Sequence, residues 1–89
     1  MEVTNNFIIG EIMDNLLPLT NLQEGEKGII SFIRGGRKVI QRLTDMGLTP
    51  GTEITVTRHA PFGPIGISVR GSELAIGRSI AMKIFVKRK

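Results

Sequence analysis

The chain has 89 residues, with 12 Lys and Arg against eight Asp and Glu, a formal net charge of +4 and no cysteine. This length suits one small domain, and the lack of thiols excludes a disulfide scaffold and a thiolate site for zinc or an iron–sulfur cluster. The charge is uneven, because residues 1–26 hold five acids and no Lys or Arg, while residues 27–89 hold all 12 bases and three acids. The basic part suits an anionic partner such as nucleic acid, a membrane surface or an acidic protein patch; the alternative is that the acidic head lies near the basic body.

Residues 6–17 carry apolar pairs that recur every four residues. The pairs are Ile8-Ile9, Ile12-Met13 and Leu16-Leu17. This spacing predicts an amphipathic helix that ends before Pro18, so we expect an acidic helical extension over residues 1–17 and the folded domain over residues 18–89. The segment is too short and too polar to span a bilayer and lacks the basic start of a secretion signal, which favours a cytoplasmic protein without membrane insertion. We expect its apolar face to pack on its own chain, with a partner protein as the alternative.

A first strand is predicted over residues 27–33. Ile29, Ile30, Phe32 and Ile33 favour a strand but break strict alternation. This pattern indicates a bulge or burial on both faces.

Residues 37–48 are predicted to form a helix and its C-terminal cap. Val39, Leu43 and Met46 lie on one apolar stripe, which predicts a helix over residues 37–46. Gly47 follows the stripe and suits the left-handed conformation that ends many helices. Leu48 supplies the apolar contact that accompanies this cap.

A tight turn and a second strand follow the helix. Pro50 fixes φ and Gly51 accepts a positive φ, which suits the two central positions of a type II turn. Ile54 and Val56 then alternate with polar residues and predict a strand over residues 53–59 with one buried face.

The remaining chain is predicted to add three strands, over residues 67–70, over residues 73–76, and around Ile84 and Val86. Gly71-Ser72 is interpreted as the hairpin turn between the first two, and residues 77–82 as a break with a single helical turn. We expect the tail over residues 87–89 to be disordered, and Phe32 and Phe85 to lie in the core. Five short strands around one core predict an all-β fold with a small antiparallel barrel.

Several motifs stand in the order and spacing of a known family. They are Pro18-Leu19-Thr20-Asn21-Leu22, Gly25-Glu26-Lys27-Gly28, Gly35-Gly36, Arg42-Leu43 with Asp45, Gly47-Leu48, Pro50-Gly51, Ala60-Pro61, Gly63-Pro64, Val69-Arg70-Gly71 and Leu74-Ala75-Ile76. Over residues 18–86 the chain resembles the FeoA family, small cytosolic proteins associated with bacterial ferrous iron uptake. The resemblance implies an SH3-like barrel. It also implies that the partner is FeoB, the membrane transporter for ferrous iron, through its cytoplasmic GTP-binding region.

The chain offers little for catalysis or metal binding. His59 is the only histidine. A hydrolytic triad would have this one imidazole as its base, and no serine lies in a nucleophile elbow. A ferrous site would also have this one imidazole, and the chain has no thiolate to add to it. Gly35-Gly36-Arg37-Lys38 at a helix start suits an anion but is not a Walker A loop, and a solvated helix face is the favoured interpretation. We therefore expect no enzyme activity, no cofactor and no metal ligand.

Residues 60–66 form the loop in which we predict a partner-binding site. Pro61 and Pro64 limit its freedom, and Phe62 and Ile65 are expected to anchor a protein partner near its tip. The alternative is that Phe62 folds back over an open end of the barrel. The same hypothesis includes three rim charges: Arg37, Lys38 and Arg42.

Two other functions stay open at this point. One is a small basic nucleic-acid-binding barrel, and the other is a stand-alone relative of the SH3-like domain of metal-dependent repressors. Barrels that bind single strands pair basic grooves with stacking aromatics, but this chain has four Phe and no Trp or Tyr, so no nucleic acid is expected. A homo-oligomer is left open as a further association.

Overall fold

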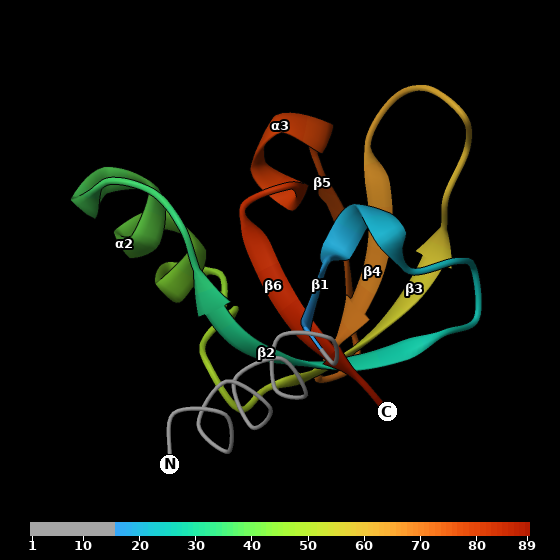
Figure 1. Cartoon of the computed structure of the whole chain (residues 1–89), viewed down its shortest axis with the longest axis horizontal. Helices are drawn as coiled ribbons and strands as arrows, with labels where there is room; N and C mark the ends of the chain where they lie inside the picture. The colour runs from blue at the N-terminus through green and yellow to red at the C-terminus, as the bar shows by residue number, and fades with distance from the viewer. Residues whose placement is uncertain (1–15) are drawn as a thin grey trace, which may run out of the picture.

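The computed structural model describes residues 16–89, which form one antiparallel sheet of six strands with three short helices (Figure 1). The strands are β1 (Leu16–Pro18), β2 (Lys27–Ile33), β3 (Glu53–Arg58), β4 (Ile65–Val69), β5 (Ser72–Ile76) and β6 (Ile84–Arg88). The helices are the 3-10 turn η1 (Leu19–Asn21), α2 (Arg37–Asp45) and α3 (Arg78–Ala81). The strand order is β1-β6-β2-β3-β4-β5. In Figure 1 the sheet curves, α2 stands at one side and the β3–β4 loop rises at the other.

One apolar core lies inside the curved sheet. Ile54 and Val56 of β3 are buried, as are Ile65, Ile67 and Val69 of β4. Each strand therefore sends alternate side chains inward, which confirms the period-2 pattern expected for β3 and β4. Burying one such side chain fully contributes about 1.5–3 kcal/mol, so the inner face of the sheet is the main source of stability.

The end of α2 is the cap that the sequence predicts. Gly47 has φ of 85°. Its amide donates to the Thr44 carbonyl and the Leu48 amide donates to the Leu43 carbonyl, each at 2.9 Å. These two bonds and the burial of Leu43 and Leu48 form a Schellman motif, which satisfies carbonyls that the helix leaves free.

The turn after α2 is also confirmed. Gly51 has φ of 91°, and the Thr52 amide donates to the Thr49 carbonyl at 3.1 Å. Pro50 and Gly51 therefore occupy the two central positions, and β3 begins directly afterwards at Glu53.

Strand β2 contains the bulge that its broken alternation predicts. Its register with β6 shifts between Ile30 and Phe32, and Phe32 then lies opposite Phe85 and Ile33 opposite Ile84. The extra residue moves Phe32 to the outer face, because it interrupts the alternation between faces. The expectation that Phe32 lies in the core is wrong, since its side chain is 41% exposed, and Phe85 is only half-buried.

The predicted N-terminal helix is wrong at its last two residues. Leu16 and Leu17 belong to β1, where they pair with Lys87 and Val86 of β6. The edge of β6 supplies backbone hydrogen-bond partners for these two residues. The helical spacing of residues 6–17 gives no information about those distant partners. Residues 6–15 of the predicted helix lie outside the described part, and the division into residues 1–17 and 18–89 stays a prediction.

The β4–β5 hairpin turns one residue earlier than predicted. Val69 pairs with Ser72, so the turn consists of Arg70 and Gly71, with φ of 50° and 83°. Two positive φ values match the twist of a type I′ hairpin turn, and Gly71 suits this geometry better than Ser72 does. Strand β4 begins at Ile65, two residues before its predicted start.

The C-terminal tail is ordered, contrary to expectation. Lys87 and Arg88 belong to β6, and the Lys89 amide donates to the Lys27 carbonyl at 3.0 Å. Arg88 also forms a salt bridge with Glu26 at 2.9 Å, and the Lys89 side chain pairs with Glu53. The strand continues because β2 offers ladder partners, which a run of three cations does not reveal.

The Glu53–Lys89 pair has a measurable signature. The Lys89 ammonium lowers the pKa of the Glu53 carboxyl, first through its hydrogen bond and then through its charge. The pair therefore favours the folded state above the ordinary pKa of glutamate, and this contribution is lost as the pH falls through the lowered pKa. We expect Lys89→Met to raise the Glu53 pKa in an NMR titration and Lys83→Met to leave it unchanged. An unchanged Glu53 pKa in Lys89→Met would contradict the pairing.

Candidate partner-binding site

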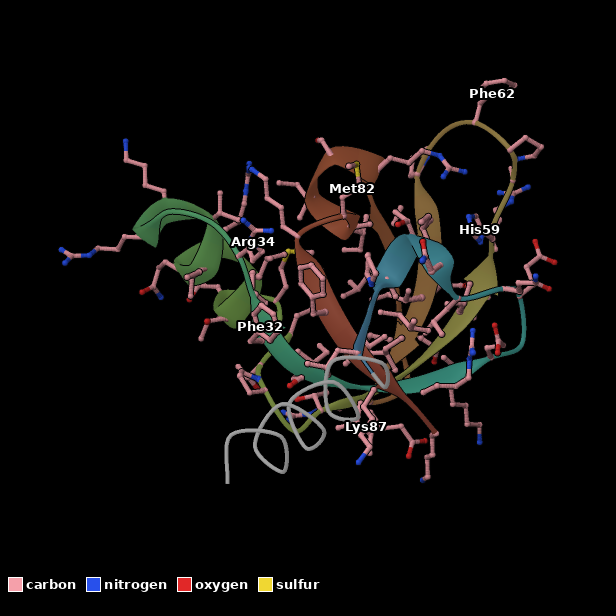
Figure 2. All side chains as sticks on the ribbon, viewed as in Figure 1. Phe32, Arg34, His59, Phe62, Met82 and Lys87 are labelled. Carbon is pink, nitrogen blue, oxygen red and sulfur yellow. The ribbon has the colours of Figure 1, made fainter. Side chains whose placement is uncertain are left out.

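The β3–β4 loop carries the most exposed large apolar side chain that the structure describes. Phe62 is 88% exposed and lies at the outer end of the loop (Figure 2). Pro61 and Pro64 flank it and are exposed, and Gly63 has φ of 91°. Phe62 therefore does not fold back over the barrel, and it faces solvent on a segment with limited conformational freedom.

Ile65 does not belong to the exposed tip. It is the first residue of β4, pairs with Ile76 and has no exposed surface. The expectation that it stands beside Phe62 in solvent is wrong, because the strand begins two residues earlier than its sequence pattern indicates. Ile65 instead holds one end of the loop in the core.

Three contacts fix the other end of the loop. The Arg78 guanidinium donates to the Ala60 carbonyl, which ties α3 to the loop. The His59 amide donates to Glu24 Oε1 at 2.9 Å, and His59 Nδ1 lies 2.7 Å from the Leu22 carbonyl. A carbonyl only accepts, so Nδ1 carries the proton in this contact. His59 follows β3 directly, and its contacts hold this end of the loop against residues 22–24.

Met82 is a second strongly exposed apolar residue, and it lies beside Arg34 and Ser79. It is 60% exposed at the end of α3, and Figure 2 shows it on the same side of the molecule as Phe62. The sequence offered no signal for Met82, because a methionine between short elements is as common in a core as at a surface. Helix α3 thus carries an anchor for the loop, Arg78, and an exposed apolar side chain follows its last residue.

The predicted rim charges lie on a different part of the molecule. Arg37, Lys38 and Arg42 are exposed on α2, which Figure 1 places on the side opposite the β3–β4 loop. Lys38 and Arg42 line a cleft of about 270 Å³ together with Ile80 of α3. Within residues 16–89 none of the three cations forms an ion pair. The structure therefore divides the seven predicted site residues into an exposed loop, a buried Ile65 and a basic helix face.

Residues 16–89 contain no cluster of three or more His, Cys, Asp or Glu side chains that would hold a metal ion. Among the same residues, no helix is long and apolar enough to cross a membrane.

The fold is that of a small SH3-like β protein. A manganese-dependent transcriptional repressor has the same fold with a TM-score of 0.77 at 17% identity, over 83% of this chain and 42% of that one. A repressor named IdeR from T. acidophilum gives a TM-score of 0.75 at 25% identity, over 83% of this chain and 34% of that one. These likenesses concern the fold, and the chain spans less than half of each repressor.

Comparisons at higher sequence identity show the family to which the chain belongs. The FeoA domain model matches residues 17–88. A protein of Methanocaldococcus jannaschii named "Putative Fe(2+) transport protein A" is 43% identical over 72 residues, which cover 81% of this chain and 87% of that protein. A crystal structure of an iron uptake regulatory protein, FeoA, has a TM-score of 0.79 at 43% identity, over 83% of this chain and 99% of that one. The chain belongs to the FeoA family, as its motifs predict.

Proposed function

We propose that this protein is a non-enzymatic accessory protein of ferrous iron uptake that acts in the cytoplasm by binding the GTP-binding region of FeoB. Membership of the FeoA family supports the link to Fe(2+) transport. The observation that carries the binding mode is Phe62, which is 88% exposed on a loop held at both ends. An exposed aromatic on a stiff loop binds a protein surface with little loss of conformational entropy.

The surrounding geometry suits a protein contact. Met82 adds a second apolar side chain on the same side of the molecule. The basic face of α2 lies apart from this surface, so its charges act at long range rather than within the buried contact. We therefore assign Phe62 the anchoring role, and Arg37, Lys38 and Arg42 the role of steering the encounter.

A nucleic-acid-binding barrel is the second candidate, and the basic surface is the observation that favours it. The described part of the chain holds all 12 bases. Against this function, Phe62 stacks on no other aromatic ring within residues 16–89, and Phe32 and Phe85 stack on each other. Binding driven by phosphates falls steeply with salt. A gel-shift series at increasing salt, with single- and double-stranded probes, separates this function from protein binding.

The test of the proposed contact is Phe62→Ala, measured by calorimetry against the soluble GTP-binding domain of FeoB from the same organism. We expect a loss of about 2 kcal/mol or more, roughly 30-fold in Kd, because truncation removes a desolvated anchor. Phe32→Ala is the matched control, since it removes an exposed Phe at the other end of the molecule. Equal affinities for parent and Phe62→Ala, with unchanged circular dichroism, would move the interface away from this loop.

A triple variant of α2 tests the steering role. Replacing Arg37, Lys38 and Arg42 by Gln is expected to slow association and to flatten its dependence on salt, while affinity changes by less than about 1 kcal/mol per charge. Stopped-flow association at two ionic strengths measures both effects. A large rise in the dissociation rate would instead place α2 inside the contact.

A further inference from the structure

The outer face of β1, β6 and β2 is apolar although it lies away from the core. The pairing register shows this, because residues directly opposite one another share a face. Leu16 and Ile29 both pair with Lys87, and Pro18 and Phe32 both pair with Phe85. We call this surface the outer patch; it consists of Leu16, Pro18, Ile29, Phe32 and Phe85.

The outer patch is distinct from the core. Ile30 and Val86 of the same strands point inward and are buried, and Leu17 packs against them. Phe32 and Phe85 instead stack on each other with centroids 4.7 Å apart and an interplanar angle of 5°. Five apolar side chains on one face of three strands form a contiguous surface of the kind that another segment covers.

The outer patch also has a charge. Lys87 lies on the same face, between Leu16 and Ile29, and is exposed. Among residues 16–89, the salt bridges involve Arg88 and Lys89 and leave Lys87 out. Figure 2 shows Phe32 and Lys87 at the end of the molecule away from Phe62, so this surface is separate from the proposed FeoB contact.

We propose that residues 7–15 of the same chain cover the outer patch as a short amphipathic helix. Ile8, Ile9, Ile12 and Met13 recur with helical spacing and supply an apolar stripe. Glu11 and Asp14 give the segment a charge opposite to that of Lys87.

The covalent connection to β1 favours residues 7–15 over any other segment as the cover of the outer patch. The chain enters β1 at Leu16, whose side chain is itself part of the outer patch, so the segment starts beside the surface that it covers. Crossing from β1 to β2 requires two interstrand spacings, about 10 Å. Nine helical residues span about 13 Å, which is sufficient. A covalently attached segment also has a high effective concentration at this surface compared with a second copy or another protein.

Disulfide trapping tests the assignment directly, because the chain contains no cysteine that would interfere. The test variant combines Ile12→Cys with Ile29→Cys, and the matched control combines Ile12→Cys with Ser72→Cys, an exposed site on β5. We expect the test variant to form an intrachain disulfide at least about tenfold faster than the control under mild oxidation, since its thiols are held together. Intact mass and non-reducing gels distinguish it from an interchain product.

Dye binding gives a second readout that needs no cysteine. Deleting residues 2–13 is expected to increase the fluorescence of an added apolar dye several-fold, and Phe32→Ser in the truncated chain is expected to reverse most of this increase. Equal trapping rates in test and control variants, or unchanged dye binding on truncation, would overturn the proposal. Predominantly interchain disulfides in the test variant would overturn it in favour of a second copy of the chain.

Discussion

Ile65→Ala is expected to lower the free energy of unfolding by about 2–5 kcal/mol, the range for large-to-small substitutions of fully buried aliphatic side chains. Ile65 has no exposed surface and pairs with the buried Ile76, so its truncation leaves a cavity in the core. A loss of this size is a large part of the about 5–15 kcal/mol that stabilises a typical domain. Urea denaturation followed by far-UV circular dichroism is the suitable measurement, because the chain has no Trp or Tyr for fluorescence.

Phe62→Ala is the counterpart of this variant, only three positions away in the sequence. Phe62 is almost fully exposed, so its removal is expected to change the free energy of unfolding by less than about 0.5 kcal/mol. The two variants thus separate the effect of the loop on binding from the effect of the adjoining strand on stability. An Ile65→Ala protein as stable as the parent would show that the Ile65 side chain is not packed in the core.

Gly47→Val is expected to cost about 1–3 kcal/mol of stability, because a β-branched residue is strained at a φ of 85°. A Cβ at this position would meet no atom within 4 Å, so the cost comes from the backbone and not from a steric clash with neighbours. Thermal unfolding followed by circular dichroism measures the effect as a lower midpoint.

Gly47→Asn provides the control for this prediction. Asparagine tolerates the left-handed region better than other residues with a side chain, so its loss is expected to be clearly smaller than that of valine. If both variants unfolded at the midpoint of the parent, the Schellman cap would not contribute to stability.

Local signals in the sequence predicted much of the fold. Gly47 and Gly51 permit a positive φ that other residues rarely adopt, and both adopt it as expected. The errors occur where a partner distant in the sequence decides the outcome. Leu16 becomes a strand residue because β6 pairs with it, and Arg88 is ordered because β2 and Glu26 hold it. A pattern read over a short window contains none of these partners.

In the candidate site, too, local features were predictable and features that depend on distant contacts were not. The stiffness of the loop follows from Pro61 and Pro64, which are local features, whereas the sequence left open whether Phe62 faces solvent or folds back over the barrel. The position of Ile65 depends on where β4 meets β5, and the role of Arg78 depends on a contact with Ala60 that spans 18 residues. Phe32 lies on the outer face and not in the core, because the sequence indicates a bulge in β2 but not the residue at which it occurs. A shift of one residue moves a side chain to the opposite face of the sheet.

The position of β6 determines the order in which this sheet can be built. It lies between β1 and β2, although it is the last of the six strands in the sequence. During synthesis β1 emerges from the ribosome first, yet its ladder partner, residues 84–88, is translated after every other strand. The hairpin of β4 and β5 can form early because its contacts are local, whereas closing β1 onto β6 joins positions 16 and 87 across a long loop. The edge of β2 that pairs with β6 therefore stays open to chaperones, or to other nascent chains, until residues 84–88 have been translated.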